Sequence, residues 1–419
     1  MKKKTSNKST AIALACGIAF GLAGFCMAAP FRTVPWNGHV GAVSFTFDDA
    51  YETQFLNLKP LLDAMPDVHV TFFLTGFQDR LTKNAEGFAA LANSGNEIGN
   101  HTLSHWRLPE ETDDELEVEI TDFADTIEAA LAKYGADVNI VSFATPGCEN
   151  GENIKKVIQK RHMINRDCGF DGRNKWDVEP DWMSLKAKIW SRTDVTVNEM
   201  LNALDTAAFI GTFNNTNPLE PQITEGTWLV VLQHDVSERT IDYLSINPDD
   251  IKRLFERAVK NKLWIAPLGT VAAYQRAHFI IENATMDKID NGYSVKWKIP
   301  HERMPKSVPL RIQIDTTRVS SKTTLEQDGK KLTPESDGSY IIEFMSQSLI
   351  MRNTGNIPLP KAKPKKAIAS YSKFTLYDLR GKKLGATNGF SVPKDYPKGI
   401  YIIRAEAEKL PAITKKVAK

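Results

Sequence analysis

The chain has 419 residues, a length that predicts two or three domains rather than one. Its composition, 42% hydrophobic and 25% charged, is typical of a folded protein, and a formal net charge of +2 gives no nucleic-acid signature. Residues 352–419 hold 16 lysines and arginines against 4 aspartates and glutamates, so the basic excess lies in the tail and the rest of the chain is acidic. No nucleic acid is expected among the partners.

Residues 1–28 follow the order of a secretory signal peptide. Four lysines within the first eight residues precede an apolar run from Ala11 to Met27, and the small residues Ala28 and Ala29 come next. An uncleaved membrane anchor is the alternative, but three glycines interrupt the run and Ala-Ala-Pro follows it. We therefore expect an exported protein, secreted or held at the cell surface, with no integral membrane domain after removal of the signal.

From residue 38 to about 281, short apolar runs alternate with amphipathic stretches, as in βα units around a parallel sheet. Helices are expected over 111–134, ahead of Gly135 as a cap, and over 249–260. Six or more units of this kind predict an α/β fold, a distorted (β/α) barrel over residues 29–284. The expected strands are 40–47, 69–74, 140–144, 163–166, 228–233 and 263–267.

The pattern changes after the barrel region. Short alternating runs, separated by Asn-Gly, Asp-Gly and proline-containing turns, predict a small β-sandwich as an accessory domain over 285–353. Three prolines among four lysines predict an extended linker over 354–370, and a β-rich module is expected over 371–419.

The apolar strand 43–47 leads directly into Asp48 and Asp49. Strands of α/β folds carry their chemistry at their C-terminal ends, so two carboxylates there are candidate site residues. An Asp-rich turn or a helix cap is the simpler alternative for this pair.

A second stretch, 97–105, ends in two histidines, His101 and His105. If residues 102–105 form a helical turn, both imidazoles lie on one face and can share one cation. Two imidazoles and a carboxylate make a plausible zinc site with an open position, although a histidine pair alone is equally compatible with an incidental arrangement.

Three further stretches place polar groups beside apolar runs. Residues 142–148 combine a strand with a Pro-Gly turn whose backbone amides could face an oxyanion, and a plain turn explains them equally well. Residues 176–182 contain Asp181 and Trp182, and the strand 228–233 leads into His234. A lone histidine at such a place is more often a core residue.

In this order, the five stretches resemble the polysaccharide deacetylase family, the NodB-homology domain of carbohydrate esterase family four, which includes chitin and peptidoglycan deacetylases and acetylxylan esterases. The resemblance covers about residues 38–275. Thr46-Phe47-Asp48-Asp49 matches the first family motif and His101-Thr102-x-x-His105 the second.

The resemblance implies a role for each matching residue. Asp48 would be the general base and His234 the general acid, with Asp181 orienting His234. Asp49, His101 and His105 would hold a divalent metal, most readily Zn²⁺, with Co²⁺ or Ni²⁺ as alternatives. The Gly147 amide would stabilise an oxyanion, and Trp182 and Leu232 would wall the acetyl pocket.

The implied reaction is removal of acetyl groups from a polysaccharide by water that a metal activates. Amide substrates, such as polymers of N-acetylglucosamine, and ester substrates, such as acetylxylan, both fit. The segments 167–186 and 212–225 are long enough to shape a substrate groove. The rival outside the enzyme class is a carbohydrate-binding protein that keeps the fold but has weak or no catalysis.

One motif departs from the family pattern. The third motif is commonly Arg-x-Pro-x-Gly, and here Ala144 and Cys148 replace the arginine and the glycine. Asp48 is therefore expected to lack its usual cationic partner, although Phe143-Ala144-Thr145-Pro146 resembles a Phe-Ala-x-Pro version found in part of the family. Cys148 and Cys168 are the two cysteines outside the signal, and a bridge between them would fix the oxyanion loop.

The tail has a resemblance of its own. Residues 376–382, 397–404 and 415–417 look like the C-terminal sorting domain of type IX secretion, which implies secretion machinery as a partner. The alternative is an accessory β-module that helps bind an acidic surface or polysaccharide.

Overall fold

The structure is a computed structural model, and it describes residues 29–108, 111–169, 171–190, 195–209, 225–238, 245–355, 373–377, 382–387, 397, 400–407 and 410–418. The expected signal peptide, most of segment 212–225 and nearly all of the linker lie outside the described residues. Contact between residues divides the chain into two compact units, Met1–Ile357 and Pro358–Lys419. No helix in the described ranges is both long and apolar enough to cross a membrane.

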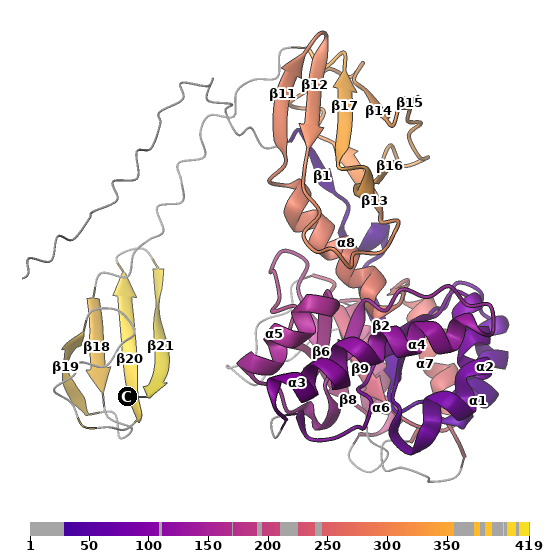
Figure 1. The fold of residues 1–419 in the computed structure, drawn as a ribbon. Helices are drawn as coiled ribbons and strands as arrows, with labels where there is room; N and C mark the ends of the chain where they lie inside the picture. Colours follow the sequence, from indigo (N-terminus) through magenta and orange to yellow (C-terminus); the bar gives the residue numbers. More distant parts are fainter. Residues whose placement is uncertain are drawn as a thin grey trace, which may run out of the picture. The chain divides into compact units, whose positions relative to one another are not determined.

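Seven parallel strands close into a ring in the first unit (Figure 1). Each strand pairs with the next, and the last pairs with the first, so the distorted (β/α) barrel is confirmed. In ring order they are β2 (Ala42–Phe47), β3 (Thr71–Leu74), β4 (Glu97–Asn100), β5 (Ser142–Ala144), β6 (Ile164–Gly169), β8 (Leu185–Ile189) and β9 (Trp228–Gln233).

Two short strands fill the places where the ring is irregular. β10 (Trp264–Ile265) pairs with the first half of β2, while β3 pairs with the second half of the same edge. β7 (Arg173–Asn174) pairs antiparallel with the first half of β9, and β8 pairs with the second half of the same strand. All six predicted strands are present. The prediction missed β4, which has no alternating apolar pattern, and β8, whose Leu-Lys-Ala-Lys-Ile sequence does alternate.

Helices surround the ring on its outer side (Figure 1). They are α1 (Glu52–Asp63), α2 (Arg80–Asn93), α3 (Asp113–Leu116), α4 (Phe123–Ala132), α5 (Glu152–Arg161), α6 (Val197–Ala207) and α7 (Pro248–Lys260). α8 (Leu268–Ile281) instead runs from the barrel toward the strands that follow it in the chain. The helix predicted over 111–134 is present, but a π-helical segment, η4 (Glu117–Asp122), separates α3 from α4. The predicted helix over 249–260 corresponds to α7.

The alternation of side chains along β2 explains how the barrel delivers its acidic residues. Val43, Phe45 and Phe47 pack outward with the helices in one hydrophobic cluster. The intervening Ser44 and Thr46 donate hydrogen bonds to backbone carbonyls of neighbouring strands. Successive side chains of a strand point to opposite faces, so this parity directs Asp48 into the barrel interior.

Two further sheets follow the barrel in the same unit. One has the order β1 (Phe31–Thr33), β13 (Pro309–Ile314), β16 (Tyr340–Glu343). The other has the order β11 (Thr285–Ile289), β12 (Gly292–Lys296), β17 (Ser348–Arg352), β14 (Thr324–Gln327), β15 (Lys330–Lys331). Leu310 and Ile342 of the first sheet share one core with Val295 and Leu349 of the second. The expected alternating runs are therefore strands, but β1 pairs with β13, so residues 31–33 belong with this sheet and not with the barrel.

The second unit contains one antiparallel sheet. Its order is β19 (Lys383–Thr387), β18 (Lys373–Tyr377), β20 (Ile400–Ala407), β21 (Leu410–Ala418). Several residues of the three tail stretches that resemble a sorting domain lie outside the described residues.

Candidate active site at the C-terminal ends of the barrel strands

Asp48 and Asp49 sit where β2 turns into the loop before α1. Asp48 is buried, and its backbone N–H donates to the Gln233 carbonyl at the end of β9 at 2.8 Å. Asp49 and Ala50 both adopt left-handed backbone conformations, with φ of 76° and 54°. Such conformations cost on the order of 1–3 kcal/mol each and cluster at functional sites. The fold therefore holds the two adjacent carboxylates in different directions.

Asp49, His101 and His105 converge on one point. Three potential ligand atoms, one from each residue, lie within 4.8 Å of one another. Oδ1 of Asp49 is 3.4 Å from Nε2 of His101 and 3.1 Å from Nε2 of His105. The three sequence-predicted metal ligands are thus brought together.

His101 is oriented as a metal ligand requires. Its Nδ1 donates to the Ala144 carbonyl at 2.8 Å, and its Nε2 faces Asp49. Ligating histidines characteristically donate their second ring N–H in this way. The donor set and its orientation therefore fit a divalent cation.

The charges of the set are coupled. Burial disfavours the ionised carboxylate of Asp49, yet hydrogen bonds from His101 and His105 outweigh burial and hold the pKa of Asp49 well below its usual range. Burial lowers the pKa of His105, but the hydrogen bond to Asp49 and the charge of that carboxylate leave the pKa raised overall. Asp49 is accordingly ionised at neutral pH.

The loop that carries the two histidines is not the helical turn that we expected. Thr102 and His105 have φ of 67° and 57°, and the backbone N–H of His105 donates to Oγ1 of Thr102 at 3.0 Å. Local side-chain bonds of this kind compete with helix formation. The imidazoles still meet, with ring centroids 4.9 Å apart, because the loop is held from outside.

The π-helical segment η4 supplies that support. The Glu119 carboxylate accepts from the Ser104 N–H at 2.9 Å, and the Glu119 carbonyl accepts from the Leu103 N–H at 3.3 Å. The Asn100 side chain donates to the Ile120 carbonyl at 2.7 Å. A π-helical turn interrupts the usual α-helical hydrogen bonds, and here two of its carbonyls bind the histidine loop.

Arg166 corrects the expectation that Asp48 lacks a cationic partner. Its Nη2 donates to Oδ2 of Asp48, both side chains are buried, and the guanidinium lies over the Phe73 ring at 5.3 Å. Arg166 is the register partner of Ala144 on the adjacent strand. The chain thus places an arginine one strand away from the family position, at the same level of the barrel.

The other carboxylate oxygen of Asp48, Oδ1, is buried and accepts no hydrogen bond from any described residue. A buried acceptor without a partner costs free energy unless a water or ligand binds it. Asp48 is therefore held by one oxygen and available through the other.

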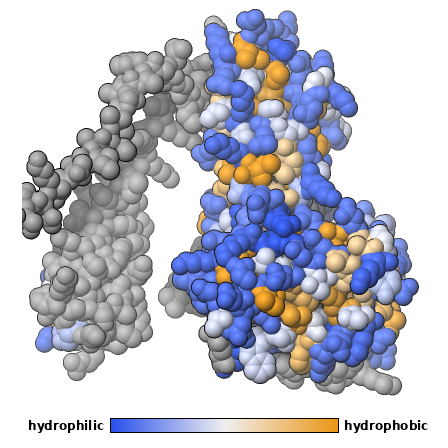
Figure 2. All heavy atoms as spheres, viewed as in Figure 1, coloured by the Kyte–Doolittle hydropathy of each residue, from blue (hydrophilic) through white to orange (hydrophobic). Residues whose placement is uncertain are grey.

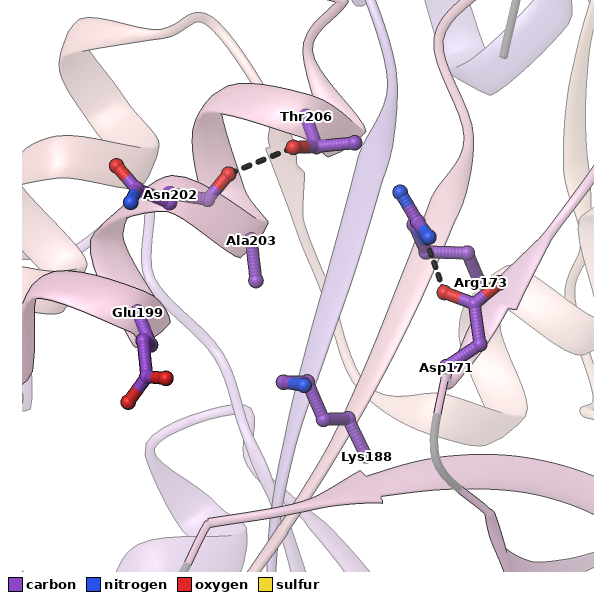
Figure 3. Close-up of a pocket in the computed structure, with 7 residues that line it drawn as sticks. All are labelled: Asp171, Arg173, Lys188, Glu199, Asn202, Ala203 and Thr206. Atoms are coloured by element: carbon purple, nitrogen blue, oxygen red, sulfur yellow. Dashed lines mark hydrogen bonds and ion pairs between the residues drawn. The ribbon is translucent and has the colours of Figure 1, made fainter. Parts of the chain in front are cut away.

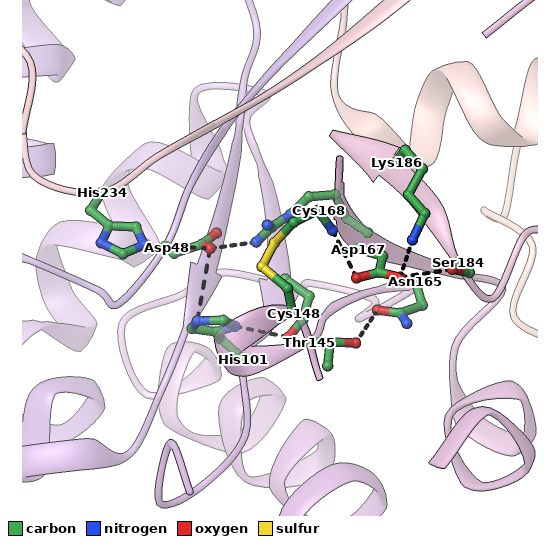
Figure 4. Close-up of a disulfide and its surroundings, with 12 residues drawn as sticks. Asp48, His101, Thr145, Cys148, Asn165, Asp167, Cys168, Ser184, Lys186 and His234 are labelled. Atoms are coloured by element: carbon green, nitrogen blue, oxygen red, sulfur yellow. Dashed lines mark hydrogen bonds and ion pairs between the residues drawn. A yellow bond between two sulfur atoms is a disulfide. The ribbon is translucent and has the colours of Figure 1, made fainter. Parts of the chain in front are cut away.

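His234 follows β9 and completes the group. Its ring nitrogens lie 3.9 Å from Oδ2 of Asp48 and 3.9 Å from Oδ2 of Asp49. Figure 4 shows His234 and His101 on either side of Asp48. Leu232 is buried two residues earlier on β9, where its backbone carbonyl accepts from the Trp190 N–H at 3.1 Å.

Asp181 and Trp182 do not have the positions that we expected. Asp181 precedes β8, and its two oxygens accept from Nζ of Lys155 at 2.8 Å and from the Met183 N–H at 3.0 Å, not from His234. Trp182 is buried under the Arg276 guanidinium, and its indole donates to Glu179. Both residues lie at the start of β8, so the structure does not bring them to the strand ends that carry Asp48 and His234.

The expected bridge between Cys148 and Cys168 is present, with a Cα–Cα distance of 5.4 Å (Figure 4). It joins the turn η5 (Pro146–Cys148), which contains the exposed Gly147 at a φ of 60°, to the strand that carries Arg166. The oxyanion loop and the cationic partner of Asp48 are therefore covalently linked.

Sequence reasoning missed three residues that position this site. Arg166 ends a predicted strand, which is the same signal that identified Asp48. Gln54 of α1 donates to the backbone carbonyls of Asp48 and His234 at 2.6 and 2.8 Å. Arg80 of α2 donates to the Asp49 carbonyl at 2.9 Å and lies 3.5 Å from its Oδ2. Both of the latter sit inside helices, where sequence offers no distinguishing signal.

A polar cavity of about 240 Å³ lies elsewhere, between β7, β8 and α6 (Figure 3). It contains an ion pair between Asp171 and Arg173, with Lys188 alongside. Segment 167–186, expected to shape a groove, instead folds back at this place, because the Gly172 carbonyl accepts from Val230 in the middle of β9. None of the predicted catalytic or metal-binding residues lines this cavity.

Residues 37–163 match the family model described as Polysaccharide deacetylase. Over these residues the chain is similar to polysaccharide deacetylases. The match includes both aspartates, both histidines and the turn at Gly147, and it ends before Arg166 and His234. No curated protein matches the chain.

Several solved structures are similar to this chain at low sequence identity. The Xyl-CE4 domain of a multidomain xylanase from the hindgut metagenome of Trinervitermes trinervoides has 12% identity and a TM-score of 0.35, over 55% of this chain and 89% of its own. A peptidoglycan deacetylase from Bacillus subtilis has 18% identity and a TM-score of 0.36, over 55% of this chain and 90% of its own. A family 4 carbohydrate esterase from Streptomyces lividans in complex with acetate has 18% identity and a TM-score of 0.33, over 53% of this chain and 88% of its own.

Proposed function

We propose that this protein is an exported, metal-dependent hydrolase that removes acetyl groups from a polysaccharide. The proposal rests on the observation that two adjacent carboxylates have different partners. Asp49 faces the two histidines of a metal-binding set, while Asp48 is paired with Arg166 and keeps one buried oxygen available.

The residues of the chain account for the proton transfers. Oδ1 of Asp48 accepts a proton from the water whose oxygen adds to the acetyl carbonyl carbon, and Arg166 holds the carboxylate in place and balances its charge. The turn at Gly147 borders the developing oxyanion. His234 gives a proton to the departing amine or alcohol as the C–N or C–O bond breaks, and acetate is the second product. A divalent cation held by Asp49, His101 and His105 would supply Lewis-acid chemistry for the same reaction.

The rival reading, a binding protein without turnover, rested on the missing arginine. Arg166 pairs with Asp48, so Asp48 has a cationic partner and the reason for this alternative no longer holds. Both amide substrates, such as N-acetylglucosamine polymers, and ester substrates, such as acetylxylan, remain compatible with the proposed chemistry.

Export would follow from the signal-like residues 1–28, and the basic tail would engage secretion machinery or, alternatively, an acidic surface or polysaccharide. Removal of residues 371–419 tests this part. Loss of secretion from the cell with unchanged intracellular activity supports the sorting role, whereas normal secretion with weakened glycan binding supports the accessory role.

The enzyme proposal is tested by acetate release from chitin oligomers, peptidoglycan glycan and acetylxylan. Wild type is compared with its chelated form, with the form restored by Zn²⁺, Co²⁺ or Ni²⁺, and with Asp48→Asn. Release that needs both the metal and Asp48 is expected with at least one substrate. No release from any of them by metal-loaded wild type would contradict the proposal.

A further inference from the structure

Trp106 directly follows His105 and stands apart from the other tryptophans. All eight lie within the described residues, and six of the remaining seven are buried, for example Trp36, Trp190 and Trp228. Trp264, the seventh, is half-buried and packs against Tyr274 at 5.2 Å. Trp106 is 59% exposed and takes part in none of the ring contacts among the described residues. The fold therefore gives this indole no packing role.

Two further apolar side chains are partly exposed at the histidine loop. The barrel and sandwich surfaces are mainly hydrophilic, with scattered apolar areas (Figure 2). Next to the histidine loop, however, Phe77 is 41% exposed and Leu103 is 40% exposed. The Phe77 ring lies 6.0 Å from the His105 ring, and Gly76 is packed against Leu103 so closely that a Cβ there would meet it at 2.8 Å. Exposed apolar side chains gathered at one place mark a binding surface.

The backbone on both sides of Trp106 is anchored. His105 is held by Thr102, and Ser104 by Glu119, as described above. On the other side, Arg107 makes a two-point ion pair with Glu149, at 3.0 and 2.7 Å, and Leu108 is fully buried. Glu149 adjoins the bridged Cys148. The exposed indole is therefore presented by a fixed frame that spans the histidine loop and the oxyanion loop.

We propose that Trp106 is a specificity-determining platform on which a pyranose ring of the glycan stacks, next to the sugar that carries the acetyl group. This inference rests on the proposed function. A pyranose presents an apolar face of C–H groups and a rim of hydroxyls, so an indole can cover the face without burying the polar rim. Consecutive Cα atoms are about 3.8 Å apart, which places the backbone of Trp106 within one sugar length of the backbone of His105. A rigid, preorganised aromatic contributes strongly to affinity because little conformational entropy is lost on binding.

The test compares Trp106→Ala and Trp106→Phe with Tyr134→Ala. Tyr134 is a suitable control because it is 48% exposed and follows the C-terminal end of α4, on the approach to the start of β5 rather than at a strand end. Acetate release is measured on acetylated oligomers of N-acetylglucosamine and xylose, from one to six units. We expect Trp106→Ala to raise KM for the longer oligomers about tenfold, the size of effect seen when an anchoring tryptophan is truncated.

The remaining comparisons separate stacking from a structural role. The single-sugar substrate should show no change, Trp106→Phe should retain most of the affinity, and Tyr134→Ala should behave as wild type. Because Trp106 is exposed, its removal should leave the melting temperature almost unchanged. Equal losses on one-unit and six-unit substrates, or no loss on either, would overturn the inference.

A binding readout keeps this inference distinct from the enzyme proposal. Metal-loaded Asp48→Asn is titrated with the same oligomers while its tryptophan fluorescence is recorded, with and without Trp106→Ala. A glycan-dependent fluorescence change that disappears with Trp106→Ala supports the platform even if wild type releases no acetate. A change that persists in the variant, or the absence of any change in the parent, overturns the inference.

Discussion

An aspartate paired with a cation occurs both at the ends of the barrel strands and just before β8, but the two pairs differ in burial. At the strand ends, Asp48 is buried and paired with the buried Arg166. Before β8, the Asp181 carboxylate is 57% exposed and paired with Lys155 on the surface of α5. Both pairs are Asp with a cation, yet one lies inside a closed barrel and the other in solvent.

The difference shows that position along a strand decides what a carboxylate can do. In the interior, removal from water strengthens every electrostatic interaction and makes each unpaired charge costly. At the surface, water and salt screen the same pair. The resemblance to the family assigns Asp181 to the site, but the carboxylate of this residue lacks the burial that such chemistry requires.

Parallel substitutions of the two aspartates should show the largest contrast. Asp48→Asn removes the proposed proton acceptor, and we expect kcat/KM to fall by about 10²–10⁴-fold, the usual contribution of a general base. Asp181→Asn should leave kcat/KM unchanged. Acetate release measures both. Similar losses in the two variants would mean that Asp181 acts on the reaction despite its contacts with Lys155.

Substitution of the cationic partners should also have a larger effect on stability in the barrel interior, at Arg166, than at the surface, at Lys155. Arg166→Met leaves Asp48 buried without a counter-charge and should lower the free energy of unfolding by about 3–5 kcal/mol. Lys155→Met, the matched surface change, should cost less than about 1 kcal/mol. Urea denaturation in the presence of a chelator measures both without a contribution from bound metal. If Arg166→Met were as mild as Lys155→Met, Arg166 would not be the functional partner of Asp48.

The bridge should contribute to stability rather than to the chemistry. Replacing both Cys148 and Cys168 by serine opens a loop with a sequence separation of 20 residues. The expected loss is about 3 kcal/mol in the free energy of unfolding. Chemical denaturation of oxidised wild type, reduced wild type and the double variant checks this. Identical stability before and after reduction would show that the bridge does not form in solution.

The π-helical support should affect metal binding. Glu119→Ala removes the acceptor of the Ser104 N–H and should weaken metal affinity by about 10–100-fold, as is typical for groups that orient ligands. Glu117→Ala is the control, because Glu117 lies on the same segment and pairs with Lys160 at the surface. Titration against a competing chelator reports the affinity. Equal affinities in the two variants would leave η4 without a role in the site.

The smallest expected effect concerns pH. Burial acts to raise the pKa of Asp181, but hydrogen bonds from Lys155 and the Met183 N–H leave it lowered. A lowered folded-state pKa means that the stabilisation is present above the unfolded-state pKa and is lost as pH falls through the folded-state value. The melting temperature of wild type should therefore exceed that of Asp181→Asn slightly at pH 7, and the difference should disappear in acid. A difference that grows in acid would contradict this assignment.

Local sequence determined much of this protein. The alternation of apolar residues predicted six barrel strands, and the parity of β2 predicts the inward direction of Asp48. The motif resemblance assigned Asp49, His101 and His105 to a metal-binding set, and the structure brings these three residues together. These features depend on periodicity and on chain neighbours, which are properties of the sequence itself.

Only the tertiary structure decided the partners. Arg166 lies 118 residues from Asp48, and only the pairing of β5 with β6 brings it to the level of Ala144. The histidine loop is not helical, because Thr102 and the later segment η4 bind its backbone N–H groups. Asp181 was excluded from the site because it lies before a strand that sequence analysis had missed. Contacts of this kind form only when strands pair and helices pack. The motif around Ala144 therefore gives no sign that Arg166, on the next strand, takes the place of the family arginine.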